Sequence, residues 1–192
     1  MGNREDLLVA AKRCLYEKGY ARTTARDIAT AAGVSLAAIG YHYGSKEALL
    51  NAALQQAIEE WGGDLARLLT SEAEAGLAGD RFARTWTKVI DSFAATRPLW
   101  EVQFELLAHI ERTPELRSTL ADAHRQARLG LAELFGYDAA YDERRALRMG
   151  AFYQVLLGGL AAQWLADPAG ALSGSDLLEA MRTVLTENDK TL

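Results

Sequence analysis

The sequence predicts an all-α protein, and three observations support this fold class. Prolines stand at only three positions, 98, 114 and 168, in a chain rich in the helix formers Ala, Leu, Glu and Arg. Apolar residues recur at the 3.6-residue spacing of a helix face, as between Leu7 and Leu15. Glycines and capping residues divide these periodic segments into about nine helices. With 49% apolar residues, the 192-residue chain can bury a sizeable core.

Two helices are expected before residue 33. Asn3 can cap the first, which ends at Gly19 because glycine readily adopts the left-handed conformation that closes a helix. Thr24 and Asp27 have the three-residue spacing of a capping box, which predicts the start of a short second helix. Gly33 ends that helix after little more than two turns.

Two further helices follow directly. Ser35 is expected to cap a third helix over residues 36–43, which ends at Gly44. Ser45 is expected to cap a fourth, which continues to about residue 69. The first fifty residues therefore predict three short helices and the start of a long one.

Five helices are expected in the remaining chain. Asp80 can cap the first of them. The next, over 99–110, is apolar nearly all round and is expected in the middle of the helical body. Another runs from residue 113 to about 135, Asp142 caps a long one that ends before residue 167, and Ser175 caps the last.

Neither a membrane span nor a secretory leader is expected. The apolar run 151–166 falls short of the ~20 residues that a bilayer-spanning helix needs. Residues 1–6 are polar, and the single Cys14 cannot form an intramolecular disulfide. The sequence therefore predicts a cytoplasmic protein without membrane contact.

Charge is distributed unevenly along the chain, whose formal net charge is −5. Residues 1–50 hold seven Lys and Arg against five Asp and Glu, whereas the remaining 142 residues hold fourteen against twenty-one. This asymmetry is typical of a modestly basic contact module on an acidic body.

Residues 25–43 have the pattern of a helix-turn-helix, in which one helix crosses a phosphate backbone and the next enters the major groove. Gly33 permits the tight turn, and Val34 can fill the core between the helices. Ser35 leaves the amide groups at the start of the next helix free to face a phosphate. Aromatic side chains lie at the end of that helix. Lys46 follows them and supplies a positive charge that can contact the DNA phosphate backbone.

This region resembles the signature of the TetR family of regulators. The matching residues are Thr23-Thr24-Ala25-Arg26-Asp27-Ile28-Ala29, Ala32-Gly33-Val34-Ser35 and Tyr41-His42-Tyr43-Gly44-Ser45-Lys46-Glu47-Ala48-Leu49. The resemblance implies a homodimeric repressor of double-stranded operator DNA, in which a small molecule bound in the body spreads the two reading heads. It implies a helix-turn-helix DNA-binding domain over 1–46 and a helical ligand-binding and dimerisation domain over 47–192.

The resemblance also assigns DNA-binding residues position by position. Backbone-contacting places are matched by Thr24, Tyr41, His42 and Lys46, and places near base edges by Arg26, Leu36, Ala37 and Ala38. Ser35 and Tyr43, at the two ends of the reading helix, complete the predicted set. Leu36 stands where the family commonly has a polar or basic residue, and Gly40 stands where it commonly has a tyrosine. Direct readout of base edges is therefore expected mainly from Arg26, whose guanidinium fits guanine.

Each DNA assignment has a structural alternative. His42 and Tyr43 would pack between helices, Lys46 would be a solvated charge, and Arg26 would pair with a carboxylate of its own domain.

A small-molecule pocket is predicted in the body, because aromatic residues are frequent there. Its predicted lining is Trp86, Ile90, Phe93, Trp100, Gln103, Phe104 and Phe152. The alternative is an ordinary aromatic core. Glu101 and Glu105 share a helix face, which would attract a cationic compound unless both carboxylates point to water.

Small residues on the long helix after Asp142 would let another helix approach closely, which predicts half of an intersubunit four-helix bundle. The predicted dimer interface is Tyr153, Leu157, Gly158, Ala161, Ala162, Leu177, Met181 and Val184. The alternative is close packing within the subunit.

The sequence thus predicts a DNA-binding regulator, a repressor that a small-molecule effector releases from its operator. Control by a protein partner, or activation in place of repression, are the alternatives from the same class. A small helical enzyme is the alternative from another class, but His42, His109 and His124 lie on different predicted helices. No glycine-rich phosphate loop or metal-ligand spacing is present, so no cofactor, metal or catalytic residue is predicted.

Overall fold

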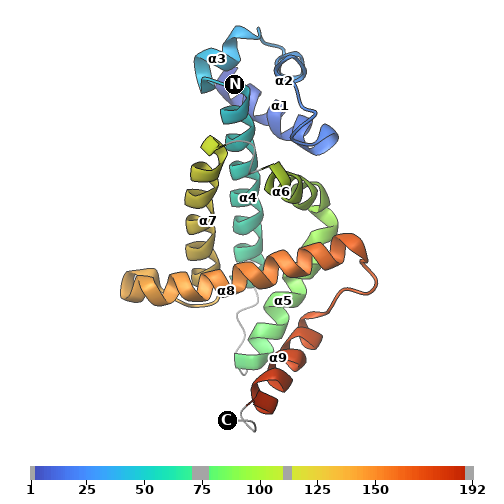
Figure 1. Cartoon of the computed structure of the whole chain (residues 1–192), viewed down its shortest axis with the longest axis vertical. Helices are drawn as coiled ribbons and strands as arrows, with labels where there is room; N and C mark the ends of the chain where they lie inside the picture. Colours follow the sequence, from blue (N-terminus) through green and yellow to red (C-terminus); the bar gives the residue numbers. More distant parts are fainter. Residues whose placement is uncertain (1–2, 71–77, 110–113, 189–192) are drawn as a thin grey trace. The chain divides into compact units, whose positions relative to one another are not determined.

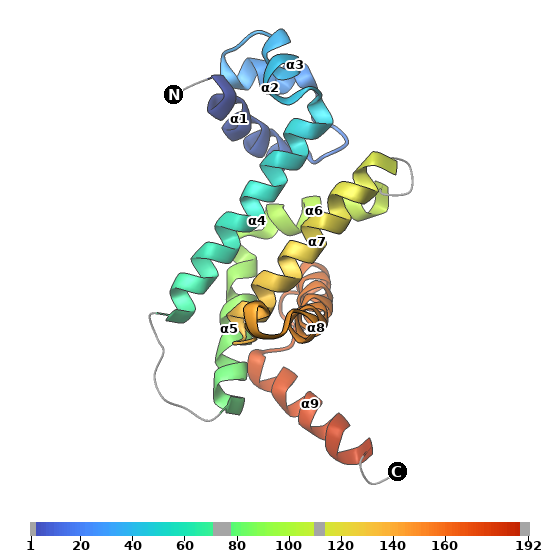
Figure 2. The same ribbon diagram turned by 90° about the vertical axis from the view of Figure 1, so that its left-hand side faces the viewer.

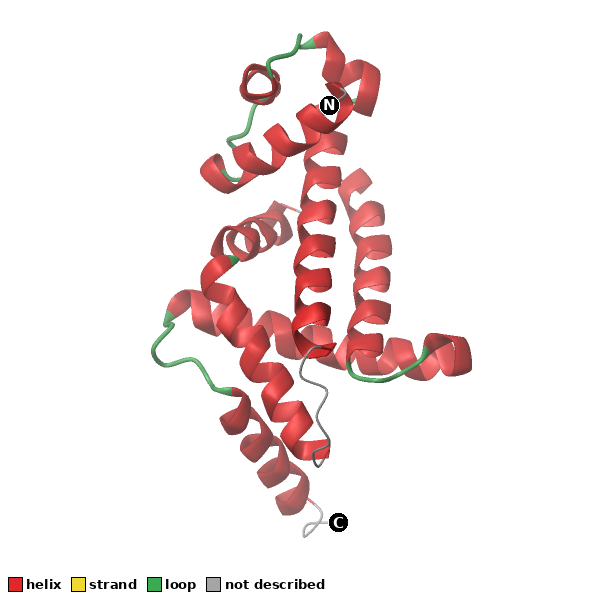
Figure 3. Cartoon of the chain, turned by 180° about the vertical axis from the view of Figure 1, so that it is seen from behind, coloured by secondary structure: helices red, strands yellow, loops and turns green. Residues whose placement is uncertain are grey.

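The computed structural model of the chain describes residues 3–70, 78–109 and 114–188. Every regular element in these residues is an α-helix, and Figure 3 shows helices joined by loops in this part of the chain. The predicted all-α class is confirmed, with nine helices among the described residues. In chain order (Figure 1) they are α1 (Asn3–Lys18), α2 (Ala25–Ala32), α3 (Ala37–Tyr43), α4 (Lys46–Thr70), α5 (Ala78–Ala95), α6 (Arg97–His109), α7 (Pro114–Leu134), α8 (Ala139–Ala166) and α9 (Gly174–Asn188).

The chain divides into two compact units. The first comprises Met1–Gly62 with Arg97–Leu120, and the second comprises Gly63–Thr96 with Ala121–Leu192. Helices α1, α2, α3 and α6 belong to the first unit, whereas α5, α8 and α9 belong to the second. Helix α4 begins at Lys46 and runs through the boundary expected between residues 46 and 47, so that division into functional domains stays a prediction.

Capping residues set the bounds of α2 as the sequence predicted. The Thr24 hydroxyl accepts a hydrogen bond from the Asp27 backbone N–H (3.1 Å), and the Asp27 carboxylate accepts one from the Thr24 N–H (2.9 Å). This reciprocal pair satisfies two donors that a helix start leaves free. Gly33 ends α2 in the left-handed conformation, and the Val34 N–H closes the turn by donating to the Ala29 carbonyl.

The cap of α3 differs from the expectation. Helix α3 begins at Ala37, Leu36 occupies the N-cap position, and no side chain caps it. The Ser35 carbonyl, rather than its hydroxyl, accepts the bond from the Ala38 N–H (3.0 Å). The Ser45 hydroxyl does accept from the Ala48 N–H (3.0 Å), so the predicted cap of α4 is confirmed.

One apolar core joins α1, α2, α3, the first half of α4 and α6. Its fully buried members include Leu7, Leu15, Ile28, Leu49 and Leu50 from the N-terminal helices and α4, and Leu99, Val102 and Leu106 from α6. The apolar helix expected in the middle of the body therefore contacts α1 and shares the core of the first unit instead. Its end at Ile110, and the start of the following helix at Thr113, lie outside the described residues.

In the second unit α5 packs against α9 and contacts α8. Helix α5 begins at Ala78, two residues before the Asp80 cap that was expected. Glycine permits a close approach at Gly150 of α8, where an added Cβ would lie 1.9 Å from the Arg128 carbonyl oxygen of α7. Backbone atoms cannot yield to a side chain at that distance, so α7 and α8 cross with their main chains in contact.

The predicted caps at Asp142 and Ser175 in the second unit have different outcomes. Helix α8 begins at Ala139 after an Asp138 cap, and Asp142 interrupts its helical backbone. The Asp142 carboxylate accepts from the Arg145 N–H (2.9 Å), so Asp142 caps the long part of α8 as expected. Ser173 caps α9 in place of Ser175, because its three-residue spacing to Asp176 forms a capping box.

The apolar run 151–166 forms a helix that is buried on one face only. Tyr153, Leu157, Leu160 and Ala161 are buried, whereas Val155 remains 73% exposed. Within the described ranges, no helix has both the length and the apolar character needed to cross a bilayer.

Candidate nucleic-acid interface

Helices α2 and α3 contact each other (Figure 2). None of the predicted DNA-binding residues on and around them is buried. Tyr41 is 85% exposed and Leu36 is 53% exposed. The exposed members of the predicted set are Thr24, Arg26, Ser35, Leu36, Ala37 and Tyr41, and the half-buried ones are Ala38, His42, Tyr43 and Lys46. Ile39 is the buried residue by which α3 packs on the core.

Arg26 lies exposed in the first turn of α2, and no carboxylate among the described residues pairs with it. The alternative of an internal ion pair is therefore absent from this part of the chain. A guanidinium without a partner keeps all five donors available to a base edge or a phosphate.

Lys46 has partners within its own unit. Its ammonium donates to the Thr23 carbonyl (3.2 Å) and lies 3.3 Å from the Glu47 carboxylate. These contacts hold the start of α4 against the residue that precedes the α2 cap. Contact with a DNA phosphate stays a prediction for Lys46.

Tyr43 anchors α3 to α1. Its hydroxyl donates to the Arg4 carbonyl (2.8 Å), the Arg4 guanidinium lies 5.5 Å from the ring centre, and the ring packs on the core. Tyr41 and His42 form an edge-on pair with ring centres 4.8 Å apart. The structural alternative weighed for Tyr43 is thus realised, while its contact with DNA stays a prediction.

An ion pair supports the start of α2. The Lys18 ammonium lies 2.6 Å from the Asp27 carboxylate, which also accepts the capping bonds from Thr24. The Lys18 hydrogen bond, followed by those from Thr24, holds the pKa of Asp27 well below its usual range. Asp27 is therefore charged near neutral pH and is committed to holding α2 in place.

The aromatic residues predicted to line a pocket are divided between the two units. Trp100, Gln103 and Phe104 lie on α6 in the first unit, where Trp100 meets Trp61 edge-on at 5.2 Å. Trp86 and Phe93 are buried in the second unit, which also contains the partly exposed Ile90 and Phe152. The set is thus not brought together within either unit, and its role as a pocket stays a prediction.

Trp86 lies in a cluster of aromatic rings. Phe135 stacks on Trp86 with ring centres 5.6 Å apart and on Tyr153 at 3.9 Å. The Trp86 side chain is fully buried, yet its indole N–H has no acceptor within the described chain. A buried donor without an acceptor is rare and costly, and an arriving acceptor group would satisfy it.

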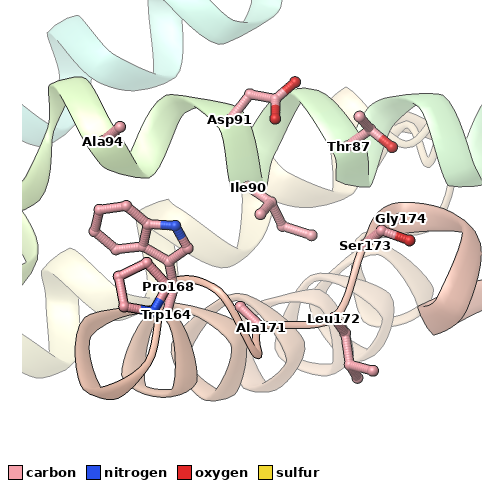
Figure 4. Close-up of a pocket in the computed structure, with 10 residues that line it drawn as sticks. All are labelled: Thr87, Ile90, Asp91, Ala94, Trp164, Pro168, Ala171, Leu172, Ser173 and Gly174. Carbon is pink, nitrogen blue, oxygen red and sulfur yellow. The ribbon is translucent and has the colours of Figure 1, made fainter.

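A pocket of about 310 Å³ lies elsewhere in the second unit, between α5, the end of α8 and the loop before α9. Figure 4 shows Ile90 and the indole of Trp164 facing this space. Ile90 is its one member from the predicted lining; the complete lining is Thr87, Ile90, Asp91, Ala94, Trp164, Pro168, Ala171, Leu172, Ser173 and Gly174. The loop residues of this lining have no periodic pattern, so the sequence does not predict that they line a pocket with α5 and α8.

The residues predicted for dimerisation fall into two groups. Tyr153, Leu157, Ala161 and Leu177 are buried within their own subunit, in keeping with the intramolecular alternative. The exposed or half-buried group is Gly158, Ala162, Met181 and Val184. Val155 and Leu185, which lie outside the predicted set, are also exposed apolar residues of α8 and α9.

Glu101 and Glu105 do not form a joint anionic face. Glu101 pairs with Arg97 at 2.7 Å, one turn earlier on α6. Glu105 accepts hydrogen bonds from two backbone amides of the turn between α1 and α2. In the described residues, no group of three or more His, Cys, Asp or Glu side chains is placed to hold a metal ion.

Comparison with known proteins identifies similar regulators. Residues 7–53 match the family model described as "Bacterial regulatory proteins, tetR family". The HTH-type transcriptional regulator TtgR of Pseudomonas putida is 30% identical over 172 residues, covering 86% of this chain and 81% of that protein. The HTH-type transcriptional repressor KstR2 of Rhodococcus jostii is 26% identical over 140 residues, covering 73% and 68%. The crystal structure of the multidrug binding protein EbrR complexed with proflavin shares 27% identity and a TM-score of 0.60, covering 97% of this chain and 99% of that one.

Proposed function

The chain belongs to the TetR family of transcriptional regulators, and from this membership we propose that it is a repressor that binds operator DNA as a homodimer and leaves it when a small molecule binds. Its relatives are transcriptional regulators, and KstR2 is named as a repressor. Proteins of this kind act by occupying DNA, and their reading helices require a solvent-exposed face.

The observation that carries the proposal is the exposed face of α2 and α3. Arg26 stands there without an ion-pair partner in the described chain, and Tyr41 and Leu36 extend into solvent. The capping box and Gly33 fix α2 relative to the turn that leads into α3. A rigid pair of helices with exposed donors and apolar groups suits a major groove, where guanine edges and thymine methyls are read.

Two features of the second unit support control by a small molecule. The 310 Å³ pocket is lined by apolar side chains such as Ile90 and Trp164 and by polar ones such as Thr87 and Asp91, and its volume lies at the lower end of the range of ligand sites. The unsatisfied indole N–H of Trp86 would bond to an acceptor on a ligand that entered the aromatic cluster. EbrR, whose structure contains proflavin, is similar to this chain along nearly its whole length.

Exposed apolar residues of α8 and α9 support the homodimer. Val155 of α8 and Val184 and Leu185 of α9 are each more than half exposed. Burying such residues against a second copy removes apolar surface from water, which is the main driving force of stable association.

The function is tested by titrating the full chain onto the DNA upstream of its own gene and onto a scrambled duplex of equal length. A repressor binds the upstream DNA at least about a thousandfold more tightly than the scrambled duplex. Equal binding to both duplexes, or binding to neither, would contradict the proposal.

Proflavin is a suitable first probe of effector control. If it is an effector, it lowers affinity for the upstream DNA, and the upstream DNA lowers affinity for proflavin by the same factor, because coupling between two sites is reciprocal. Binding of proflavin without this reciprocity excludes it as an effector. Release by a protein partner, or activation of transcription on binding, would replace the corresponding part of the proposal.

A further inference from the structure

The turn between α1 and α2 is held by a carboxylate from a helix more than eighty residues away in sequence. Glu105 Oε2 of α6 accepts a hydrogen bond from the Tyr20 N–H (2.8 Å), and its Oε1 accepts one from the Ala21 N–H (2.9 Å). Both bonds have an ionised acceptor, and such bonds are about twice as strong as those between neutral groups. All three residues belong to the first compact unit.

Gly19 makes the room for this carboxylate. Its φ of +82° is a conformation that residues with a side chain rarely adopt. A Cβ added to Gly19 would lie 2.6 Å from Glu105 Oε2, too close for ordinary contact. The glycine that ends α1 therefore also leaves the space that the Glu105 carboxylate occupies.

The same turn leads directly into the DNA-facing helix. The buried Thr23 hydroxyl donates to the carbonyls of Cys14 and Gly19, and the Tyr20 hydroxyl donates to Asn51 of α4. Thr24 then caps α2. Only residues 22–24 separate the Ala21 amide from the first residue of α2. We therefore expect a displacement of the amides bound by Glu105 to displace the first turn of α2.

We propose that Glu105 is a positioning residue for DNA binding, which fixes the α1–α2 turn and with it the place of α2 and Arg26 while touching no DNA itself. The proposal rests on the proposed function, because it assigns Glu105 a part in operator binding. This role differs from a contribution to overall stability, because Leu99, Val102 and Leu106 already pack α6 into the apolar core that it shares with α1 to α4.

The test compares Glu105→Gln with Glu101→Gln in the full chain. Glutamine keeps the size of the side chain but removes the charge that strengthens both bonds. Glu101 lies one turn earlier on α6, is exposed and pairs with Arg97, so its variant controls for loss of a charge from the same helix. Amide hydrogen exchange of Tyr20, Ala21 and Leu15 is measured by NMR, and affinity for the upstream DNA is measured over a salt series.

We expect Glu105→Gln to speed exchange at Tyr20 and Ala21 by about tenfold, as loss of a charge-assisted bond implies. Exchange at Leu15, inside α1, should not change. Affinity for the upstream DNA should fall by about tenfold with an unaltered salt slope, because no phosphate contact is lost. Glu101→Gln should match the wild type in every measurement.

Three results would overturn the proposal. Unchanged exchange at Tyr20 and Ala21 would show that the two bonds do not form in solution. Faster exchange at Leu15 as well would give Glu105 a general structural role, and unchanged DNA affinity would remove its part in binding. If the wild type binds no DNA selectively, the proposed function itself fails and the positioning role fails with it, whereas exchange still decides whether the two bonds exist.

Discussion

Arg26 and Lys46 both carry positive charge near the proposed DNA face, but their surroundings differ. Arg26 is exposed and has no carboxylate partner in the described chain, so its guanidinium can reorient toward a base. The Lys46 ammonium already bonds to the Thr23 carbonyl and lies near Glu47. A planar guanidinium can read guanine with two parallel bonds, whereas an ammonium acts as a point charge.

Arg26→Ala should therefore weaken binding to the operator selectively. Loss of a bidentate guanine contact costs roughly 1–3 kcal/mol and relaxes preference at one base pair. Titration of the variant onto the operator, single-base variants of it and a scrambled duplex measures this effect. Equal weakening on all duplexes would make Arg26 a phosphate-binding or structural residue.

Lys46→Ala should weaken binding to every duplex almost equally. Removing one phosphate contact per subunit flattens the slope of log affinity against log salt by about 0.9 per subunit. A salt series with the wild type and Arg26→Ala as references measures the slope. An unchanged slope would leave Lys46 with its structural role toward Thr23 alone.

Asp27 makes the stability of the folded chain depend on pH in the acid range. Its pKa is lowered in the folded chain, chiefly by Lys18, so its stabilising effect is present above the ordinary carboxyl pKa of about 4 and is lost as the pH falls through the lower, folded value. Asp27→Asn should lower the free energy of unfolding at pH 7 and differ less from the wild type near pH 2. Urea unfolding of both proteins between pH 2 and pH 7 measures the difference. A gap that stays constant over this range would contradict the assignment.

At the scale of the helices, the sequence predicted those ends that depend on local chemistry. Thr24 with Asp27, Gly33 and Ser45 act as expected, because each cap is completed within three or four residues. Ser35 does not, since α3 begins at Ala37 without any side-chain cap. Ser175 does not, because Ser173 forms the capping box with Asp176. The Asp142 cap was found, but the short helical segment before it was not.

The candidate sites divide in the same way, into one that follows from local sequence and others that do not. The exposed face of α2 and α3 follows from the motif, since its residues are close together in sequence. The pocket near Trp164 and the bonds from Glu105 to Tyr20 and Ala21 join segments that lie far apart in the chain. Periodicity and residue spacing do not predict such long-range contacts, because these contacts depend on how the helices pack.

The cap of α9 provides a test at this scale with a matched control. Ser173→Ala should lower the free energy of unfolding by about 1 kcal/mol, the usual cost of losing an N-cap side chain. Ser175→Ala, two residues into the helix, should change it by no more than about 0.5 kcal/mol. Urea unfolding of both variants at pH 7 decides between the two serines, and a larger effect at Ser175 would contradict the cap seen in the structure.

At the scale of the whole molecule, the property to test is assembly. Sedimentation at micromolar concentration should give twice the 21.0 kDa mass of the chain. Gly158→Leu should shift the protein toward monomer, because Gly158 belongs to the predicted interface and a Cβ there meets no atom from elsewhere in the described chain within 4 Å.

Gly130→Leu on α7 is the control, since a Cβ there also has open space. A wild type that sediments as a monomer while binding the operator would refute the dimer. A dimer unaffected by Gly158→Leu would place the interface on another surface.

The core that α6 shares with α1–α4 bears on how such a protein can be re-engineered. A chimera made by joining residues 1–46 to the body of another regulator would separate the head from Leu49, Leu50 and the apolar face of α6 on which it packs. It would also leave the Tyr20 and Ala21 amides without the Glu105 carboxylate. The smallest exchangeable unit is discontinuous in sequence, so a graft that changes DNA specificity has to carry α6 along with the helix-turn-helix.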